Sequence, residues 1–373
     1  MTMKNLNKRL QMEATPLIDG DTATFVWKGA APPNLRGDFS NWEGVPAGAW
    51  QSGPKGFWTY QHEFPTDAYL EYCYGEDGSR QSDPFNNRLT SNGIGFENHY
   101  FYMPEGRPSQ WAVADNAVPR GTVSRHRVAT DGTISRRQRT VYLYRPPVAG
   151  PVPLLLVYDG RDYRRRAKLT TIVDNLIATG RMTPVALALL PNAGTGRMAE
   201  YACSEGMLLF LLHKLLPLAE RELDLLPLAD NPGAFGVMGA SMGGLMALFT
   251  GLRLPHIFGH VYSQSGAFEF GPYQSLVFDL VAARTRPDLQ LYLDVGQFEW
   301  LLEPNRHMRA ALHKAGYTFS YHEFNAGHNY PAWRDNLHRG LARLFPAAPE
   351  PEVGAGAVDR RAVNIWGKEF RKV

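Results

Sequence analysis

The stretch Gly239-Ala-Ser-Met-Gly-Gly244 is the strongest indication of the fold of this chain. It follows a short apolar run, residues 234–238, and precedes a helical run, residues 245–253. A G-x-S-x-G pattern between a strand and a helix is typical of a nucleophile elbow, a turn too sharp for side chains beside the serine. Such a turn exposes the Ser241 hydroxyl and puts the backbone N–H of Met242 at a helix start, where a developing negative charge is stabilised. A plain tight strand–helix connection would have the same residues, so the interpretation depends on a base and an acid elsewhere in the chain.

Apolar strands alternate with helices from about residue 118 onward. Two long strands are expected first, at 123–130 and 133–146, and later strands at 152–158, 184–190, 234–238, 258–263, 289–295 and 318–324. Helices are expected at 164–179, 204–223, 245–253, 303–315 and 330–345. This alternation indicates a mostly parallel sheet covered on both faces. An antiparallel pair followed by parallel strands, with Ser241 after the fifth strand, matches the order of the α/β-hydrolase fold, whose ligands bind at the carboxyl ends of the strands.

The first part of the chain has a different pattern. Residues 20–105 contain short alternating strands separated by turn-rich segments, which predicts a smaller Ig-like β-sandwich. We expect three regions: this sandwich at 1–112, an α/β-hydrolase domain at 113–345 and a linker-like tail at 346–373. Gly37-Asp-Phe-Ser-Asn-Trp42, with Asp83-Pro-Phe-Asn86, resembles the Ig-like modules beside glycogen-branching enzymes and some esterases. Trp42, Trp58 and Tyr60 are expected to fill the core or face the other domain, with sugar stacking as the alternative.

Composition excludes several classes of function. The 373 residues are 44% hydrophobic and carry a net charge of +3 without a long basic run, so no nucleic-acid partner is expected. The two cysteines, Cys73 and Cys203, are expected to be free thiols in a reducing compartment. The start of the chain lacks the apolar core of a secretion signal, and no apolar run has the length of a membrane span, so a cytoplasmic protein is expected. We expect neither a metal nor another cofactor, and the sequence does not indicate an oligomeric state.

A candidate base and a candidate acid follow Ser241 in the required order. His328 lies between the last predicted strand and the last predicted helix, where a loop can reach the serine. Glu299 lies on the loop that leaves the strand at 289–295, where its carboxylate can hold the productive tautomer of His328. Asp294, within that strand, and Glu303, at a helix start, stay open as alternatives for the acid.

The loop after the third strand, Tyr158-Asp-Gly-Arg-Asp162, is where a second oxyanion donor is expected. The backbone N–H of Gly160 or Arg161 is the candidate. The same region is strongly basic, and it is either a solvated helix face or a rim that attracts an anionic substrate; its basic residues are Arg161, Arg164, Arg165, Arg166 and Lys168.

Several motifs together resemble a known family. They are Tyr158-Asp-Gly-Arg-Asp-Tyr163, Val173-Asp-Asn-Leu-Ile-Ala178, Arg197-Met-Ala-Glu-Tyr201, the Ser241 elbow, Phe258-Gly-His-Val-Tyr-Ser-Gln-Ser-Gly266 and Gly327-His328 with Trp333. Over about 140–345 the chain resembles the enterochelin (ferric siderophore) esterase and esterase-D-like group of α/β-hydrolases, whose siderophore esterases also carry an N-terminal β domain. The resemblance implies an ester hydrolase with Glu299 as the triad acid. It also implies that Arg197 and Glu200 lie near the substrate, and we count Arg161 and Trp333 with them as expected contacts.

The expected function is therefore hydrolysis of a small-molecule ester through Ser241, His328 and Glu299, with a siderophore or similar aryl-acyl ester as substrate. Because Gly37–Trp42 resembles sugar-binding modules, a feruloyl or acetyl esterase acting on carbohydrate is the alternative. A non-catalytic glycan-binding protein is a third reading, disfavoured because a scaffold needs none of the three residues.

Overall fold

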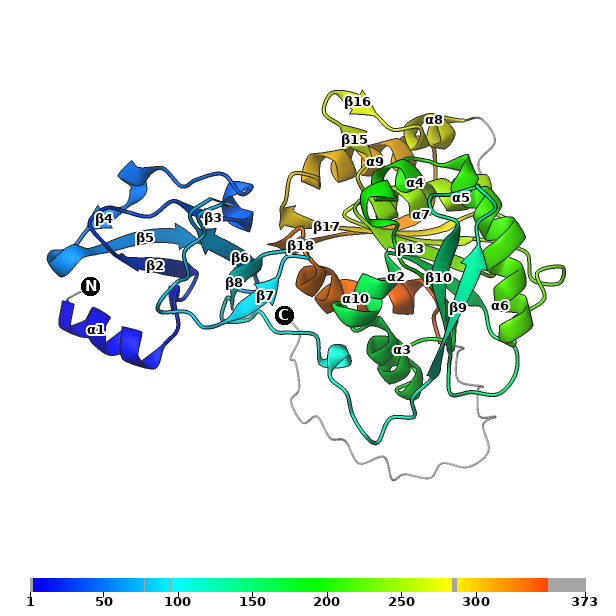
Figure 1. The fold of residues 1–373 in the computed structure, drawn as a ribbon, viewed down its shortest axis with the longest axis horizontal. Coiled ribbons are helices and arrows are strands. Elements are labelled where there is room, and N and C mark those ends of the chain that lie inside the picture. The colour runs from blue at the N-terminus through cyan, green and yellow to red at the C-terminus, as the bar shows by residue number, and fades with distance from the viewer. Residues whose placement is uncertain (1–2, 77, 94, 284–286, 348–373) are drawn as a thin grey trace, which may run out of the picture.

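The computed structural model describes residues 3–76, 78–93, 95–283 and 287–347. A smaller β-rich N-terminal body lies beside a larger body in which helices cover a central sheet (Figure 1). Of the tail predicted at 346–373, the part from residue 348 onward lies outside the described residues.

The sheet of the larger body has the predicted strand order. In space the strands run β9-β10-β12-β11-β13-β14-β17-β18, with antiparallel pairing only around β10 and parallel pairing from β12 to β18. The strands from β11 to β14 are buried along their length apart from His260, as expected when both faces are covered. Their bounds are β9 Thr122–Ala129, β10 Gln138–Arg145, β11 Leu154–Tyr158, β12 Ala186–Leu190, β13 Gly236–Ala240, β14 His260–Gln264, β17 Gln290–Phe298 and β18 Phe319–Gly327.

Helices cover both faces of this sheet. On one face, α2 (Gly160–Arg165), α3 (Leu169–Ala178) and α10 (Tyr330–Leu344) bury one apolar cluster. The other face carries a second cluster under α5 (Glu205–Phe210), a π-helical turn (Leu211–Leu215), α6 (Leu216–Glu222), α7 (Met242–Arg253), α8 (Val277–Ala282) and α9 (Leu302–Lys314). Two smaller elements stand near the top of Figure 1, the short helix α4 (Arg197–Tyr201) and the hairpin of β15 (Glu269–Phe270) and β16 (Tyr273–Gln274).

The N-terminal body is built from two sheets around an aromatic core, as the predicted sandwich requires. One sheet has the order β1-β2-β5-β4, and β3, β6, β8 and β7 belong to the other. Phe25, Tyr72 and Phe101 are fully buried between them. The bounds are β1 Leu17–Asp19, β2 Thr22–Lys28, β3 Leu35–Gly37, β4 Gln51–Ser52, β5 Phe57–Glu63, β6 Tyr69–Tyr74, β7 Leu89–Ser91 and β8 Glu97–Tyr102.

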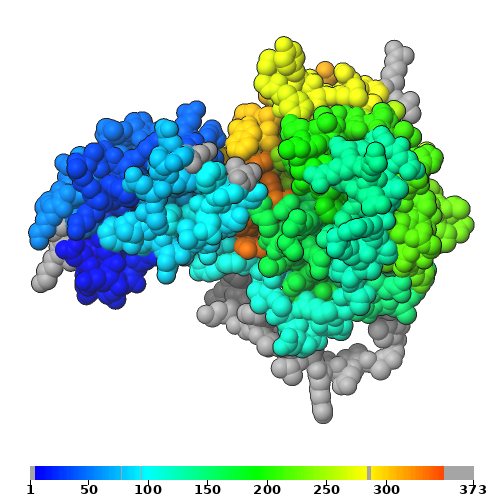
Figure 2. Space-filling model, viewed as in Figure 1, coloured from blue at the N-terminus to red at the C-terminus, as the bar shows by residue number. Residues whose placement is uncertain are grey.

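The two bodies share a sheet, which the sequence pattern does not indicate. Strand β6 pairs in parallel with β18 at Tyr69 and Ala326, so the second N-terminal sheet continues the edge of the hydrolase sheet. The Phe64 ring packs on the Phe298 ring, with centroids 5.9 Å apart. Figure 2 shows a notch in the surface where the blue N-terminal atoms meet the yellow and orange atoms of the larger body. The N-terminal body is therefore attached directly beside the ends of β17 and β18.

Two local predictions were wrong, and one helix was not predicted. The helix expected at 164–179 is two helices, because Lys168 adopts a left-handed φ of 54° between α2 and α3. The strand expected from 133 begins at Gln138, because Thr130 and Thr133 close a turn before it. An N-terminal helix, α1 (Met3–Met12), was not expected; it buries Leu6 in a small cluster with Leu17, Val26 and Phe57.

No single helix in the described ranges is both long and apolar enough to span a membrane. One pair of helical segments, 194–201 and 205–222, passes by length and composition but is bent by 101°.

Candidate active site

Ser241 occupies the sharp turn between β13 and α7. Its φ of 59° and ψ of −123° are strained for a residue with a side chain, as a nucleophile elbow requires. Gly239 has no room for a Cβ atom, because one there would overlap the backbone of Gly243. Two backbone hydrogen bonds hold the turn: Ser241 N–H donates to Gln264 O at 2.9 Å, and Ala267 N–H donates to Ser241 O at 3.0 Å.

Glu299 and His328 meet at the same edge of the sheet. Each directly follows one of two neighbouring parallel strands, β17 and β18, so the chain direction brings both side chains to the carboxyl edge. His328 Nδ1 lies 2.9 Å from Glu299 Oε2, and the Glu299 side chain is fully buried while that of His328 is 12% exposed. A buried carboxylate on Nδ1 holds an imidazole so that Nε2 is free to accept a proton.

Two tryptophans pack on the His328 ring. The ring centroid lies 4.8 Å from that of Trp300 and 4.9 Å from that of Trp333, which meets it edge-on. Trp333 Nε1 donates to Ser265 Oγ at 2.9 Å, on the segment whose residue Gln264 accepts from Ser241. This chain of contacts connects the histidine loop to the elbow. Trp333 is only 4% exposed and packs against His328, and its expected contact with substrate stays a prediction.

The two alternative acids do not reach His328. Asp294 is fully buried; its Oδ2 accepts from the Tyr262 hydroxyl at 2.7 Å and from Gln264 Nε2 at 3.3 Å. Burial raises the pKa of Asp294 to about 7. Glu303 is exposed and pairs with Arg306 on α9. Of the three candidates, Glu299 is the one that contacts the imidazole.

The loops that carry the candidate oxyanion donors are joined by Arg197. Gly160 and Arg161 begin α2, and Met242 begins α7, so their N–H groups precede the intrahelical hydrogen-bond ladder. Arg197 Nη2 donates to Asp159 Oδ2 at 2.6 Å and to Ala240 O at 3.2 Å. Because Asp159 precedes Gly160 and Ala240 precedes Ser241, this guanidinium fixes the two candidate donor segments relative to each other. The charge of Arg197 is engaged by buried Asp159, and its expected contact with substrate stays a prediction.

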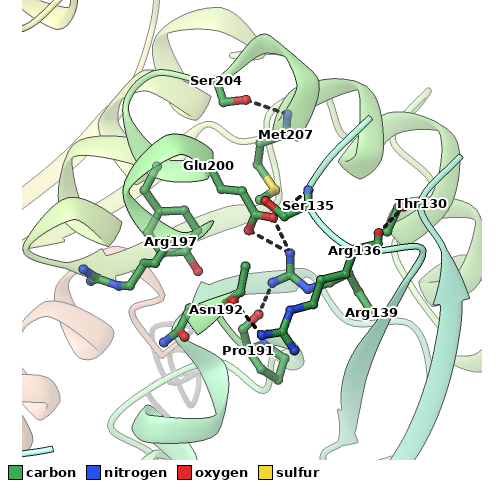
Figure 3. A network of polar contacts seen from close by, with 12 residues as sticks. Thr130, Ser135, Arg136, Arg139, Pro191, Asn192, Arg197, Glu200, Ser204 and Met207 are labelled. Atoms are coloured by element: carbon green, nitrogen blue, oxygen red, sulfur yellow. Dashed lines mark hydrogen bonds and ion pairs between the residues drawn. The ribbon is translucent and has the colours of Figure 1, made fainter. Parts of the chain in front are cut away.

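Glu200 points away from this guanidinium. Figure 3 shows Arg197 and Glu200 leaving α4 on opposite sides. Arg139 Nη1 donates to both carboxylate oxygens of Glu200, and the backbone N–H of Ser135 donates to Oε1. Arg139 and Glu200 are 4% and 3% exposed and form a buried ion pair between β10 and α4, and the expected substrate contact by Glu200 stays a prediction.

The basic segment after β11 is partly engaged within the protein. The Arg164 guanidinium lies over the Tyr142 ring and that of Arg166 over the Tyr330 ring. Arg166 Nη2 also donates to Ser91 O of the N-terminal body. Arg161, Arg165 and Lys168 are exposed, so these three residues could form a basic rim.

A cavity of about 370 Å³ lies beside His328, between the two bodies. It combines aromatic, cationic and carboxylate side chains, and its lining is Arg36, Asp38, Trp42, Glu71, Arg80, Asn92, Asn98, Trp300, His328 and Asn329. Trp300 is 56% exposed and therefore open to a ligand. Trp58 and Tyr60 instead pack against the sandwich core, which agrees with the core expectation for these two aromatics.

Sequence reasoning missed Asp38, Trp300, Asp159 and Arg139. Trp300 could have been predicted, because it directly follows the predicted acid Glu299 in the sequence. The other three act through contacts between segments far apart in the chain, for which the sequence pattern gives no signal. No group of three or more His, Cys, Asp or Glu side chains within the described part of the chain is arranged to hold a metal ion.

The strand order, the elbow after the fifth strand of the larger sheet and the Glu299–His328 pair define an α/β-hydrolase. The family model called Esterase matches residues 133–344, more than half of the chain, and the protein belongs to this family.

Curated relatives agree with this membership, and a solved structure agrees with the fold. The chain is similar to the iron(III) enterobactin esterases of Dickeya dadantii, 28% identical over 269 residues, and of Escherichia coli K12, 27% identical over 201 residues. These alignments span 65% and 52% of this chain but only 61% and 50% of those relatives. In fold, the chain is similar to the crystal structure of ferric enterobactin esterase from Salmonella typhimurium, with a TM-score of 0.70 at 19% identity, covering 89% of this chain and 95% of that one.

Proposed function

We propose that the protein is a serine carboxylester hydrolase with Ser241 as nucleophile, His328 as general base and Glu299 as the residue that orients His328. The observation that carries the proposal is the 2.9 Å contact between Glu299 and His328, at the sheet edge where the strained Ser241 elbow also lies. A nucleophile, a base and an orienting acid at the carboxyl edge of one sheet are the parts that acyl transfer needs.

The proposed reaction has two halves. His328 Nε2 takes the proton of Ser241 as Oγ attacks the ester carbonyl, and the oxyanion is stabilised by the N–H groups of Met242 and of Gly160 or Arg161. The alcohol leaves with the proton from His328, and an acyl-enzyme stays on Ser241. Water then attacks with His328 again as base, which releases the acid.

The proposed substrate is a small ester with an aryl-acyl group, of the siderophore kind. Two observations support it: the similar curated proteins are named iron(III) enterobactin esterases, and the cavity beside His328 offers Trp42 and Trp300 together with arginines. Aromatic rings and guanidinium groups suit a planar, negatively charged ring. The exposed side chains of Arg161, Arg165 and Lys168 would add to the attraction.

A carbohydrate ester is the second candidate, because Trp42 and Trp300 could equally stack on a sugar ring. A hydrolysis panel with a ferric catecholate siderophore, a feruloyl sugar and an acetylated sugar separates the two candidates. Preference for the catecholate supports the first, and preference for either sugar ester supports the second.

The esterase proposal itself is tested with p-nitrophenyl acetate. We expect Ser241→Ala to lose at least about 10³-fold in kcat, because the acyl acceptor is removed. Ser263→Ala is the matched control: Ser263 is a buried serine on the neighbouring strand β14, and its hydroxyl has no hydrogen-bond partner among the described residues. Activity of Ser241→Ala equal to that of the control would refute the proposal.

A further inference from the structure

The segment Gly37–Trp42 of the N-terminal body makes a tightly held loop against the hydrolase body. Asn41 and Trp42 both have left-handed φ angles, 47° and 63°, which are costly for residues other than glycine. Trp42 N–H donates to Gly37 O at 2.9 Å, and Arg36 Nε donates to Trp42 O at 2.6 Å. Strain of this kind persists where the surrounding contacts over-determine the backbone, and it often marks a functional segment.

This loop buries the carboxylate of Asp38, which is 2% exposed. Oδ2 accepts from the backbone N–H of Glu71 at 2.8 Å, and Oδ1 accepts from Trp42 Nε1 at 3.2 Å. Oδ2 also accepts from Asn329 Nδ2 at 3.4 Å, across the junction between the two bodies. All three partners are donors, so the contacts suit an ionised carboxylate, which has acceptors only.

Asp38 contacts the residues on both sides of His328. On one side is Gly327, where a Cβ atom would overlap the Asp38 carboxyl group. On the other side is Asn329, whose Oδ1 accepts from Ala332 N–H at 2.9 Å and so caps α10 while its Nδ2 faces Asp38. The backbone that carries His328 is thus held between α10 and one buried carboxylate of the other body.

The surroundings of Asp38 oppose its ionisation. Burial raises the pKa of Asp38 well above its usual range, and the nearby carboxylates of Glu71 and Glu299 raise it further. A buried carboxylate next to two others is costly. The buried Asp38 carboxylate therefore does not stabilise the fold by itself. Its contacts indicate that it serves to hold neighbouring groups in place.

We propose that Asp38 is a positioning residue for His328, so that the N-terminal body completes the active site instead of serving only as a separate binding module. The proposal rests on the proposed function, because His328 needs accurate placement only if it acts as a base. A displacement of about 1 Å in a catalytic group can lower the rate about 10²-fold.

The test compares Asp38→Asn with Asp83→Asn in the full chain. Asparagine at 38 places an NH₂ group against the Trp42 or Glu71 donor, so the contact set cannot be kept. Asp83 is the matched control, a 3% exposed carboxylate in the same body. Its Oδ2 accepts from the Thr15 and Tyr72 hydroxyls and its Oδ1 from the backbone N–H of Phe85, all within the N-terminal body. With p-nitrophenyl acetate we expect Asp38→Asn to lower kcat about 10- to 100-fold with KM changed less than about 3-fold. We expect Asp83→Asn to keep the wild-type kcat.

A second measurement does not depend on turnover. The proton shared by His328 Nδ1 and Glu299 is followed by NMR and assigned by its loss in His328→Ala. We expect Asp38→Asn to shift or broaden this resonance and Asp83→Asn to leave it as in the wild type. An unchanged resonance and unchanged kcat in Asp38→Asn, or equal effects in Asp83→Asn, would overturn the proposal. Failure of the wild type to hydrolyse any ester would refute the proposed function instead, and the resonance would still decide the role of Asp38.

Discussion

At the residue scale, the site depends on which carboxylate meets His328. Glu299 lies at 2.9 Å from Nδ1, whereas Asp294 is enclosed by Tyr262 and Gln264. The two carboxylates are five positions apart, and both are buried. Because the two carboxylates have different partners, substituting each one compares a proposed orienting acid with a structural acid.

We expect Glu299→Gln to lower kcat for p-nitrophenyl acetate by about 10³- to 10⁴-fold, because an amide can hold His328 in the unproductive tautomer. Asp294→Asn should keep at least a third of the wild-type kcat, since an amide oxygen still accepts from Tyr262. Steady-state kinetics on the pair measures both. Similar losses in the two variants would contradict the assignment of Glu299.

How much of the site the sequence could predict follows from where each signal lies. Ser241 lies within a local pattern, and His328 and Glu299 follow strands whose apolar runs are visible in the sequence, so their positions could be anticipated. Their catalytic roles stay predictions. Asp38 could not be anticipated, because its role comes from a contact with Asn329, 291 positions away. The burial of Glu200 and Trp333 could not be anticipated for a related reason: it is decided by packing partners that the motif does not name.

At the element scale, the ion pair of Arg139 and Glu200 joins β10 to α4 (Figure 3). Arg197 of α4 in turn fixes the segments before Gly160 and Ser241. Arg139 also donates to the carbonyl oxygen of Pro191. The Arg139–Glu200 pair therefore affects the candidate active site indirectly, through the position of α4.

We expect Arg139→Met to destabilise the protein by about 3–5 kcal/mol, because it leaves the Glu200 carboxylate buried without its cation. The double variant Arg139→Met/Glu200→Gln should recover part of that loss. Urea unfolding followed by circular dichroism measures the change. A urea unfolding midpoint for Arg139→Met equal to that of the wild type would show that the ion pair does not stabilise the protein.

The elements themselves were mostly predictable where a strong period or an apolar run was present. The order of the eight hydrolase strands follows from such runs. The break at Lys168 was missed because lysine gives no turn signal, and α1 was missed because a short, mostly polar segment has little apolar surface to mark it.

At the scale of the whole molecule, the junction between the two bodies combines sheet continuity with side-chain contacts. Besides the β6–β18 pairing, Asp335 of α10 accepts from the Tyr102 hydroxyl at 2.9 Å and from the backbone N–H of Ser109 at 2.8 Å. The sequence predicted both bodies but not their junction, because edge-to-edge pairing of two separate sheets has no signature in the strand pattern.

We expect Asp335→Ala to speed amide hydrogen exchange of β8 and residues 109–113, because these segments lose their anchor on α10. Asp230→Ala, at an exposed carboxylate outside the junction, is the control. Exchange followed by mass spectrometry on the full chain gives the comparison. If β8 exchanges at the wild-type rate in Asp335→Ala, the side-chain contacts add nothing to the shared sheet.

The central claim is that Ser241 attacks the ester, and covalent trapping tests it most directly. A p-nitrophenyl phosphonate should transfer its phosphonyl group to the Ser241 oxygen and release one equivalent of p-nitrophenolate, and peptide mass spectrometry then locates the adduct. We predict a single adduct on the peptide containing Ser241, none in Ser241→Ala, and much slower labelling in His328→Ala. Labelling of Ser241→Ala at the wild-type rate, or an adduct on another residue, would contradict the account.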